Sequence, residues 1–162
     1  MQFDPRRREM LKTAGTTAVF GVLAAAGLAR PGPARAQSAA WNKEAFASKS
    51  LADVVKAYGG AGVEPTSDVS WGSTPEIAEN GAVVPISVTS RIPNTESIAI
   101  LIEKNPNALA ARFTFPSGTD PTVSTRVKVG QSSNVHALIK TTDGKYFVST
   151  KEVKVTLGGC GG

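Results

Sequence analysis

The chain contains one cysteine, Cys160, whose surroundings differ from those of a packing residue. Its neighbours on both sides are glycines, namely Gly158, Gly159, Gly161 and Gly162. A cysteine kept for packing usually lies among apolar side chains, but here no side chain occurs within two positions on either side. Glycine also costs the most chain entropy to order, so we expect a flexible arm with an accessible thiol. Such a thiol can form covalent adducts.

Three other interpretations of Cys160 explain the glycine-rich sequence less well than a carrier does. They are a frayed chain end, an attachment site for an anchor, and a catalytic residue. A frayed chain end does not explain why four of the five residues 158–162 are glycine. A bacterial lipid anchor would follow a leader at the other end of the chain, and a prenylation signal needs three residues after the cysteine, where this sequence has two. A thiol enzyme such as a peroxidase would need a base or a helix N-terminus at the cysteine, and the sequence has neither. We therefore expect a carrier whose sulfur is activated in the sites of partner enzymes.

The single histidine, His136, offers little chemistry of its own. It lies between Val135 and Ala137 on an expected strand, and alternation places it on the solvent side. A Ser-His-Asp hydrolase would have to use this histidine, yet no Gly-x-Ser-x-Gly motif occurs. A zinc or haem site needs several ligands, and the chain offers one His and one Cys. We predict no catalytic residue, no metal and no cofactor.

Residues 1–36 have the pattern of an export signal. Arg7 and Arg8 precede an uncharged stretch over 13–29, and an Ala-Arg-Ala sequence ends at Ala36. This is typical of a twin-arginine signal peptide with cleavage after Ala36. The uncharged stretch is rich in Gly, Ala and Thr and shorter than the about 20 strongly apolar residues that a membrane span needs. We expect folded export to the periplasm and no membrane anchor after cleavage.

The basic character of the whole chain belongs largely to this leader. Six of the 18 Lys and Arg residues and two of the 13 Asp and Glu residues lie within 1–36, which leaves 12 basic and 11 acidic residues in 37–162. A balanced charge gives no electrostatic basis for binding nucleic acid. The length of 37–162 suits one domain with a real core.

The element that opens this domain is predicted to be a helix over 37–60. Apolar residues recur at helical spacing from Leu51, Ser50 and Asp53 form an N-terminal cap, and a Gly-Gly pair ends the run. One side of the helix should therefore lie on the core.

After residue 60 the apolar residues alternate with polar ones, which indicates strands. An Asp143-Gly144 pair predicts a hairpin. Pro85 indicates that the strand over 83–89 is an edge strand or that Pro85 lies at its start. The aromatic residues are assigned to packing. Short strands separated by turn residues predict an immunoglobulin-like antiparallel β-sandwich over 37–157, followed by the arm at 158–162. The strands are expected over 83–89, 97–103, 108–115, 122–129, 135–141, 145–150 and 152–157.

Several segments taken together resemble one known family. They are the Gly-Gly-Cys-Gly-Gly arm, the twin-arginine leader, Ala-Glu-Asn-Gly-Ala-Val-Val-Pro at 78–85 and Glu-Lys-Asn-Pro at 103–106, with supporting matches at 126–128 and 151–155. They resemble the SoxY subunit of the sulfur-oxidation (Sox) system over essentially the whole chain after the leader. Asn107 and Ala108 depart from the family, which often has a second proline there, and this affects only a loop.

The resemblance implies that Cys160 carries sulfur intermediates covalently during thiosulfate oxidation. It implies SoxZ as heterodimer partner and successive reactions with the c-type cytochrome SoxAX, the hydrolase SoxB and, where present, the sulfane dehydrogenase SoxCD. The twin-arginine route carries folded proteins, which suits a heterodimer formed before export. A SoxYZ-like carrier associated with a quinoprotein dehydrogenase is an alternative, as is, less favoured, a thiol-dependent periplasmic enzyme.

Overall fold

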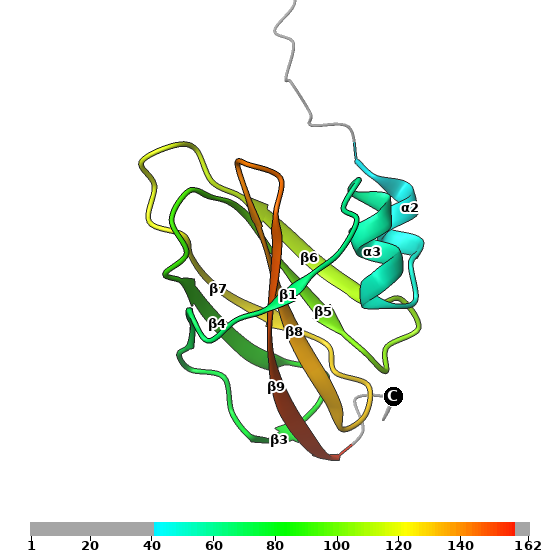
Figure 1. Ribbon diagram of the computed structural model, residues 1–162. Helices are drawn as coiled ribbons and strands as arrows, with labels where there is room; N and C mark the ends of the chain where they lie inside the picture. The colour runs from blue at the N-terminus through cyan, green and yellow to red at the C-terminus, as the bar shows by residue number, and fades with distance from the viewer. Residues whose placement is uncertain (1–40, 158–162) are drawn as a thin grey trace, which may run out of the picture. The chain divides into compact units, whose positions relative to one another are not determined.

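The computed structural model describes residues 41–157, which form a β-sandwich with two short helices (Figure 1). The predicted fold class is confirmed. The helices are α2 (Lys43–Ala47) and α3 (Leu51–Ala57). The strands are β1 (Glu64–Pro65), β2 (Val69–Trp71), β3 (Ile77–Asn80), β4 (Val84–Ser90), β5 (Thr95–Ile102), β6 (Leu109–Thr114), β7 (Thr122–Val127), β8 (Ser133–Thr141) and β9 (Tyr146–Leu157).

The two sheets differ in size and in their strand directions. The larger has the order β1-β9-β8-β5-β6, with β3 pairing the far part of β9, and the smaller has the order β2-β4-β7. Most pairs are antiparallel, as expected, but β1 and β3 both run parallel to β9. These two parallel pairs lie in a segment where the sequence pattern predicted no strand.

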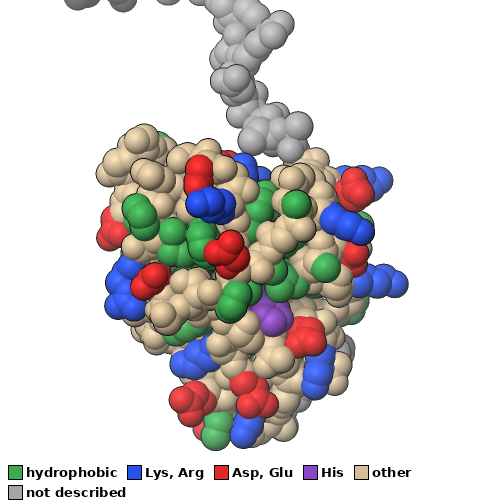
Figure 2. Space-filling model, viewed as in Figure 1, with side chains coloured by type: hydrophobic (Ala, Val, Ile, Leu, Met, Phe, Trp, Pro, Cys, Tyr) green, Lys and Arg blue, Asp and Glu red, His purple; other side chains and the backbone are tan. Residues whose placement is uncertain are grey.

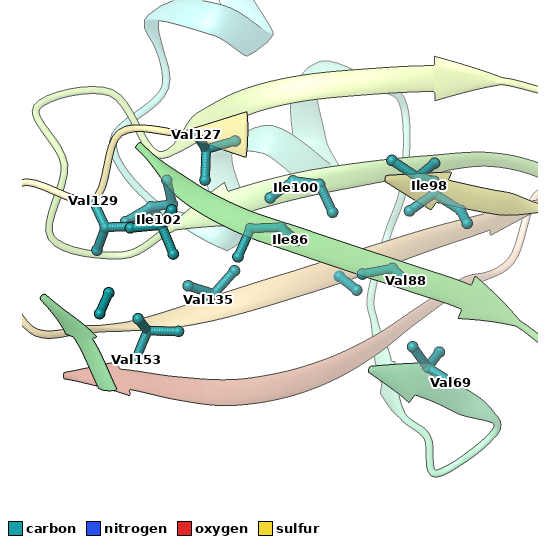
Figure 3. Packing of buried hydrophobic residues seen from close by; sticks show 14 of the residues in the cluster. Val69, Ile86, Val88, Ile98, Ile100, Ile102, Val127, Val129, Val135 and Val153 are labelled. Atoms are coloured by element: carbon teal, nitrogen blue, oxygen red, sulfur yellow. The ribbon is translucent and has the colours of Figure 1, made fainter. Parts of the chain in front are cut away.

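The main core lies between the inner faces of the two sheets. In Figure 3, Ile86 and Val88 of β4 face Ile98 and Ile100 of β5, and all four are fully buried. Each such side chain stabilises the fold by roughly 1.5–3 kcal/mol relative to an exposed position. On β7 the predicted alternation is confirmed, because its valines are buried while Arg126 is exposed.

A second apolar cluster fixes the helices on the outer face of the larger sheet. Val54 and Val55 of α3 lie over Leu101 and Leu138, all at most 4% exposed. The hydroxyl of Tyr146 in the same cluster donates a 2.9 Å hydrogen bond to the carbonyl of Tyr58 at the end of α3. Strands β5 and β8 are therefore covered on both faces, which explains the unbroken apolar run from residue 98 to 102.

The prediction of one helix over 37–60 was wrong, because the described part of this segment forms two helices. Ser48 ends α2 with extended backbone angles, and its hydroxyl donates to the carbonyl of Glu44 at 2.9 Å. Ser50 then accepts a 3.2 Å hydrogen bond from the backbone amide of Asp53 and begins α3. Serine side chains that bond the backbone favour caps over helix interiors. The predicted cap is confirmed, and residues 37–40 lie outside the described range.

Three further strand predictions can be compared with the structure. The predicted Asp143-Gly144 hairpin is confirmed, with Gly144 at a φ of 81°. Pro85 is the second residue of β4, before the part of β4 that pairs with β2, so the predicted strand start is also confirmed. The split of the last segment into two strands was wrong, since β9 is one strand of 12 residues. Within residues 41–157, no helix has the length and apolar character needed to cross a bilayer.

Candidate functional site

The predicted site residues themselves lie outside the described range. These are Cys160 and its flanking glycines Gly158, Gly159, Gly161 and Gly162, and, in the leader, Arg7, Arg8 and the cleavage position after Ala36. What the structure does describe is the strand that leads directly to the cysteine. Its last described residue is Leu157, three positions before Cys160.

The end of β9 extends past the main sheet and is held by a strand of its own. Pairing between β8 and β9 stops at Val153, and the remaining residues of β9 pair in parallel with β3, with Asn80 opposite Leu157. The backbone amide of Lys154 donates to the carbonyl of Glu76 at 2.8 Å. Strand β3 therefore fixes the point from which the segment 158–162 starts.

On its other side, the end of β9 beyond Val153 is held by a side-chain hydroxyl. The backbone amide of Val155 donates to Oγ of Ser132 at 2.9 Å, and Val155 is packed against the main core. The position of Leu157 is thus set by groups on both sides of β9. Three residues in extended conformation span at most about 10 Å, so the backbone of Cys160 lies within this distance of Leu157.

Loops from distant parts of the sequence are tied together at this end of the sandwich. The amide of Val129 donates to the carbonyl of Gly81, directly after β3, at 2.8 Å. Asn105 joins the turn after β5 to the loop after β7, because its amide group donates to the carbonyl of Lys128 at 2.8 Å and its side-chain oxygen accepts from the amide of Gly130 at 3.0 Å. Two of the segments that carried the resemblance, 78–85 and 103–106, are therefore joined through the loop after β7 at the end of the sandwich where β3 pairs with Leu157.

His136 is placed differently from the sequence prediction. Its side chain is only 14% exposed, and it lies in a cleft of about 600 Å³ beside α3 that is also lined by Leu51, Val63 and Leu101. The space-filling view shows the histidine, in purple, among apolar side chains (Figure 2). The prediction of a solvent-facing histidine was wrong because the sequence alternation could not reveal that helices cover this part of the outer face.

The contacts of His136 explain its electrostatics. Nδ1 lies 2.8 Å from Oγ1 of Thr150, and Nε2 lies 3.9 Å from a carboxylate oxygen of Glu103. Burial lowers the pKa of His136 below its ordinary value, and the charge of Glu103 offsets this only in part. Within residues 41–157 no group of three potential metal-ligating side chains comes together, around this histidine or elsewhere.

The same geometry separates His136 from the cysteine. Thr150, which contacts the imidazole, precedes Leu157 by seven positions, or about 23 Å at the rise of a strand. Cys160 extends at most about 10 Å beyond Leu157. The imidazole of His136 therefore cannot reach the sulfur in the same molecule while β9 is intact, and it is not the base that activates this thiol.

Comparisons with known proteins agree with the resemblance. The family model for sulfur oxidation protein SoxY matches residues 55–160, a range that runs from α3 through strands β1 to β9 and includes Cys160. The chain belongs to the SoxY family. The sulfur carrier protein SoxY from Chlorobium limicola f thiosulfatophilum has a similar structure, with 30% identity, a TM-score of 0.57, and coverage of 64% of this chain and 93% of that chain.

More distant structures share the sandwich. A superoxide reductase candidate from Thermotoga maritima aligns with a TM-score of 0.50 and 20% identity over 59% of this chain and 95% of that one. At this identity the likeness concerns the fold alone. The comparison with curated proteins gives no match.

Proposed function

We propose that this SoxY-family chain is a sulfur carrier of thiosulfate oxidation and holds its sulfur intermediates covalently on Cys160. The observation that carries the proposal is the match to the SoxY family over 55–160, which includes this cysteine. The flanking glycines and the fixed start of the segment at Leu157 support it, since together they suit a thin arm that leaves the domain at one defined point.

The proposed chemistry begins with an oxidation at the sulfur. The Cys160 thiolate and the outer sulfur of thiosulfate form an S–S bond, and the two electrons released pass to a c-type cytochrome, SoxAX. Water then cleaves the bond between sulfane sulfur and sulfonate in the hydrolase SoxB, which releases sulfate and two protons and leaves a persulfide anion on Cys160. Where SoxCD is present, it oxidises the remaining sulfane sulfur.

The carrier role assigns activation of the thiol to the partners. The chain's single histidine is out of reach of Cys160, as the length of β9 requires. A carrier needs no activating base of its own, because each enzyme supplies one in the site that receives the arm. We accordingly propose that the chain acts as a covalent substrate carrier and not as an enzyme.

The proposal extends to the partner subunit and the compartment. SoxZ forms the heterodimer, and residues 1–36 direct the folded pair through the twin-arginine route to the periplasm, with cleavage after Ala36. The paired arginines Arg7 and Arg8 and the Ala-Arg-Ala sequence before the cleavage position support this destination.

The direct test of the carrier role is the Cys160→Ser variant in a reconstituted Sox system. Thiosulfate-dependent electron transfer should fall to background, while folding, followed by thermal melting, should be unchanged because the residue lies beyond the packed strands. Substantial remaining turnover would move the chemistry to another residue.

A second variant separates the arm from the sulfur. Replacing Gly159 and Gly161 with Val leaves the nucleophile intact but restricts the backbone and widens the segment. Reaction with a small thiol reagent should stay close to wild type, while turnover with the partner enzymes should fall at least tenfold, because each must admit the segment into a confined site. If both rates fall together, the glycines act on the thiol itself and the arm proposal is wrong.

A further inference from the structure

The short distance between Cys160 and the folded domain constrains any protein that reacts with it. This constraint rests on the proposed function. Cys160 lies within about 10 Å of Leu157, and enzyme active sites are recessed below the surface. An enzyme that takes Cys160 into its site must therefore bring the rim of that site against the residues around Leu157. The length of the segment makes contact with the carrier domain obligatory.

The residues at this position carry exposed apolar side chains. Asn80 pairs with Leu157, and Ile77 and Val83 lie three residues before and after Asn80, within about 11 Å of it along the chain. Ile77 is 61% exposed and Val83 is 54% exposed. Among the described residues only one other large hydrophobic side chain is so exposed, that of Trp41 at 71%.

Exposed apolar residues at one functional end of a domain mark an interaction site more clearly than the same residues scattered singly. The side chains around Ile77 are charged, with the exposed residues Glu76, Glu79 and Lys154 on or next to the same two strands. At the lower end of the domain in Figure 2, where β3 lies in Figure 1, an apolar side chain lies between acidic and basic ones. A small apolar centre with a charged rim is the composition of a transient interface.

We propose that Ile77 and Val83 form a docking contact for the rim of the enzyme sites that receive Cys160. The partner that fits is an enzyme with a narrow channel no deeper than the about 10 Å reach of the segment and with apolar residues at the channel mouth. A permanently bound subunit fits this surface poorly, because it would cover the point at which the segment leaves β9. Permanent interfaces are also larger and more apolar than these two side chains provide.

The experiment compares variants of the carrier in its complex, assayed as the substrate of the hydrolase partner after loading with thiosulfate. The double variant Ile77→Ser, Val83→Ser should raise the KM for the carrier about tenfold and leave kcat within twofold, because the contact positions the carrier without touching the sulfur. Trp41→Ser is the matched control, since it also removes an exposed large apolar side chain, but from the position before the N-cap of α2, away from β3 (Figure 1). Its KM should remain that of the wild type. Thermal melting of each variant checks that the fold is retained.

A lengthened segment tests the geometric constraint. Four glycines inserted after Leu157 add about 13 Å of reach, so that contact with the domain is no longer compulsory. In this background, the double variant and its parent should have the same KM within twofold. A tenfold difference in KM that persists in the lengthened chain would contradict the constraint.

The outcomes separate this inference from the proposed function. If Cys160→Ser is inactive and the double variant has the wild-type KM, the docking contact is wrong and the carrier role stands. An equal rise of KM in Trp41→Ser also overturns the contact, because the effect would then follow general surface hydrophobicity. If Cys160→Ser retains turnover, the carrier role fails and the docking contact fails with it.

Discussion

His136 lies half-buried in a cleft, and this partial burial lowers its pKa. The cleft that holds it is lined by apolar side chains of α3 and of the outer sheet face, and Lys49 and Glu103 are the charged residues that line the same cleft. Burial lowers its pKa, and Glu103 opposes this only in part. The residue therefore belongs to the packing of the helices on the sheet and can be separated by experiment from the sulfur chemistry.

The lowered pKa predicts how stability depends on pH. Between the ordinary value of about 6.5 and the lower value in the fold, the unfolded chain binds more protons than the native state. The free energy of unfolding is therefore highest above about pH 6.5 and falls as the pH drops through this window. The variant His136→Gln keeps a hydrogen-bonding side chain beside Thr150 and removes the titration, so its stability should fall less over the same range.

Urea denaturation at about pH 7.5, 6.5 and 5.5 spans this window and measures the difference. Glu103 and Lys49 are present in both proteins, so the difference between the two profiles reports the titration of His136, including the attraction of Glu103 for its charged form. Parallel pH profiles for the two proteins would mean that the fold does not lower the proton affinity of His136.

Strand β9 illustrates what the sequence pattern conceals. Tyr146 lies in the outer cluster with α3, whereas Phe147, Val153 and Val155 pack against the inner core. Apolar residues therefore occur on both faces in the first part of the strand, which the helices cover, and only on the inner face after it. Read as simple alternation, this change looks like a break between two strands.

The two parallel strands that the sequence analysis did not predict have a common physical reason. β1 and β3 are two and four residues long, and among their side chains only Ala78 is buried. They are held by backbone pairing with β9, so their sequences show no alternation of apolar and polar residues.

The strands β4 to β8, each with a buried face, were predicted to within about two residues at each end. In the same way, the sequence was enough to propose Cys160 and its glycines as the carrier site, but it could not reveal that β3 pairs with the end of β9 before them.

Gly60 gives a prediction about the contact between α3 and the sheet. A Cβ at this position would lie 2.6 Å from Cγ1 of Val55 and 2.7 Å from Cε2 of Tyr146, so the helix end and the sheet approach too closely for any side chain. Gly60→Ala should destabilise the protein by about 1–3 kcal/mol, as overpacking does. Gly62→Ala is the matched control, because a Cβ there meets nothing within 4 Å. Equal melting temperatures of the two variants would contradict this close packing.

At the scale of the whole molecule, the fold leaves room for a partner subunit. The apolar side of α3 packs inside the domain, as the helical pattern predicted, so it is not a free binding surface. Within residues 41–157, β6 and β7 each pair with a strand on one side only and form edges of their sheets. Such edges are surfaces that another chain can cover.

Binding of SoxZ should therefore raise the thermal stability of the carrier. At a SoxZ concentration about 100 times its Kd, ligand linkage contributes about 2.7 kcal/mol, which corresponds to a rise of roughly 10 °C in Tm for a domain of this size. Differential scanning fluorimetry with increasing SoxZ measures the shift, and Cys160→Ser should give the same curve because the interaction does not need the thiol. A Tm that is independent of SoxZ concentration would exclude a stable heterodimer.

The most direct test of the carrier role is to locate the sulfur after reaction with thiosulfate. The complex is incubated with thiosulfate and the cytochrome partner, digested with trypsin, and the peptide that begins at Val155 and contains Cys160 is weighed by mass spectrometry. We predict one thiosulfonate group on this peptide, removed by a reducing agent and absent from Cys160→Ser. Turnover with an unmodified Cys160, or an adduct found on a different residue, would contradict the carrier role.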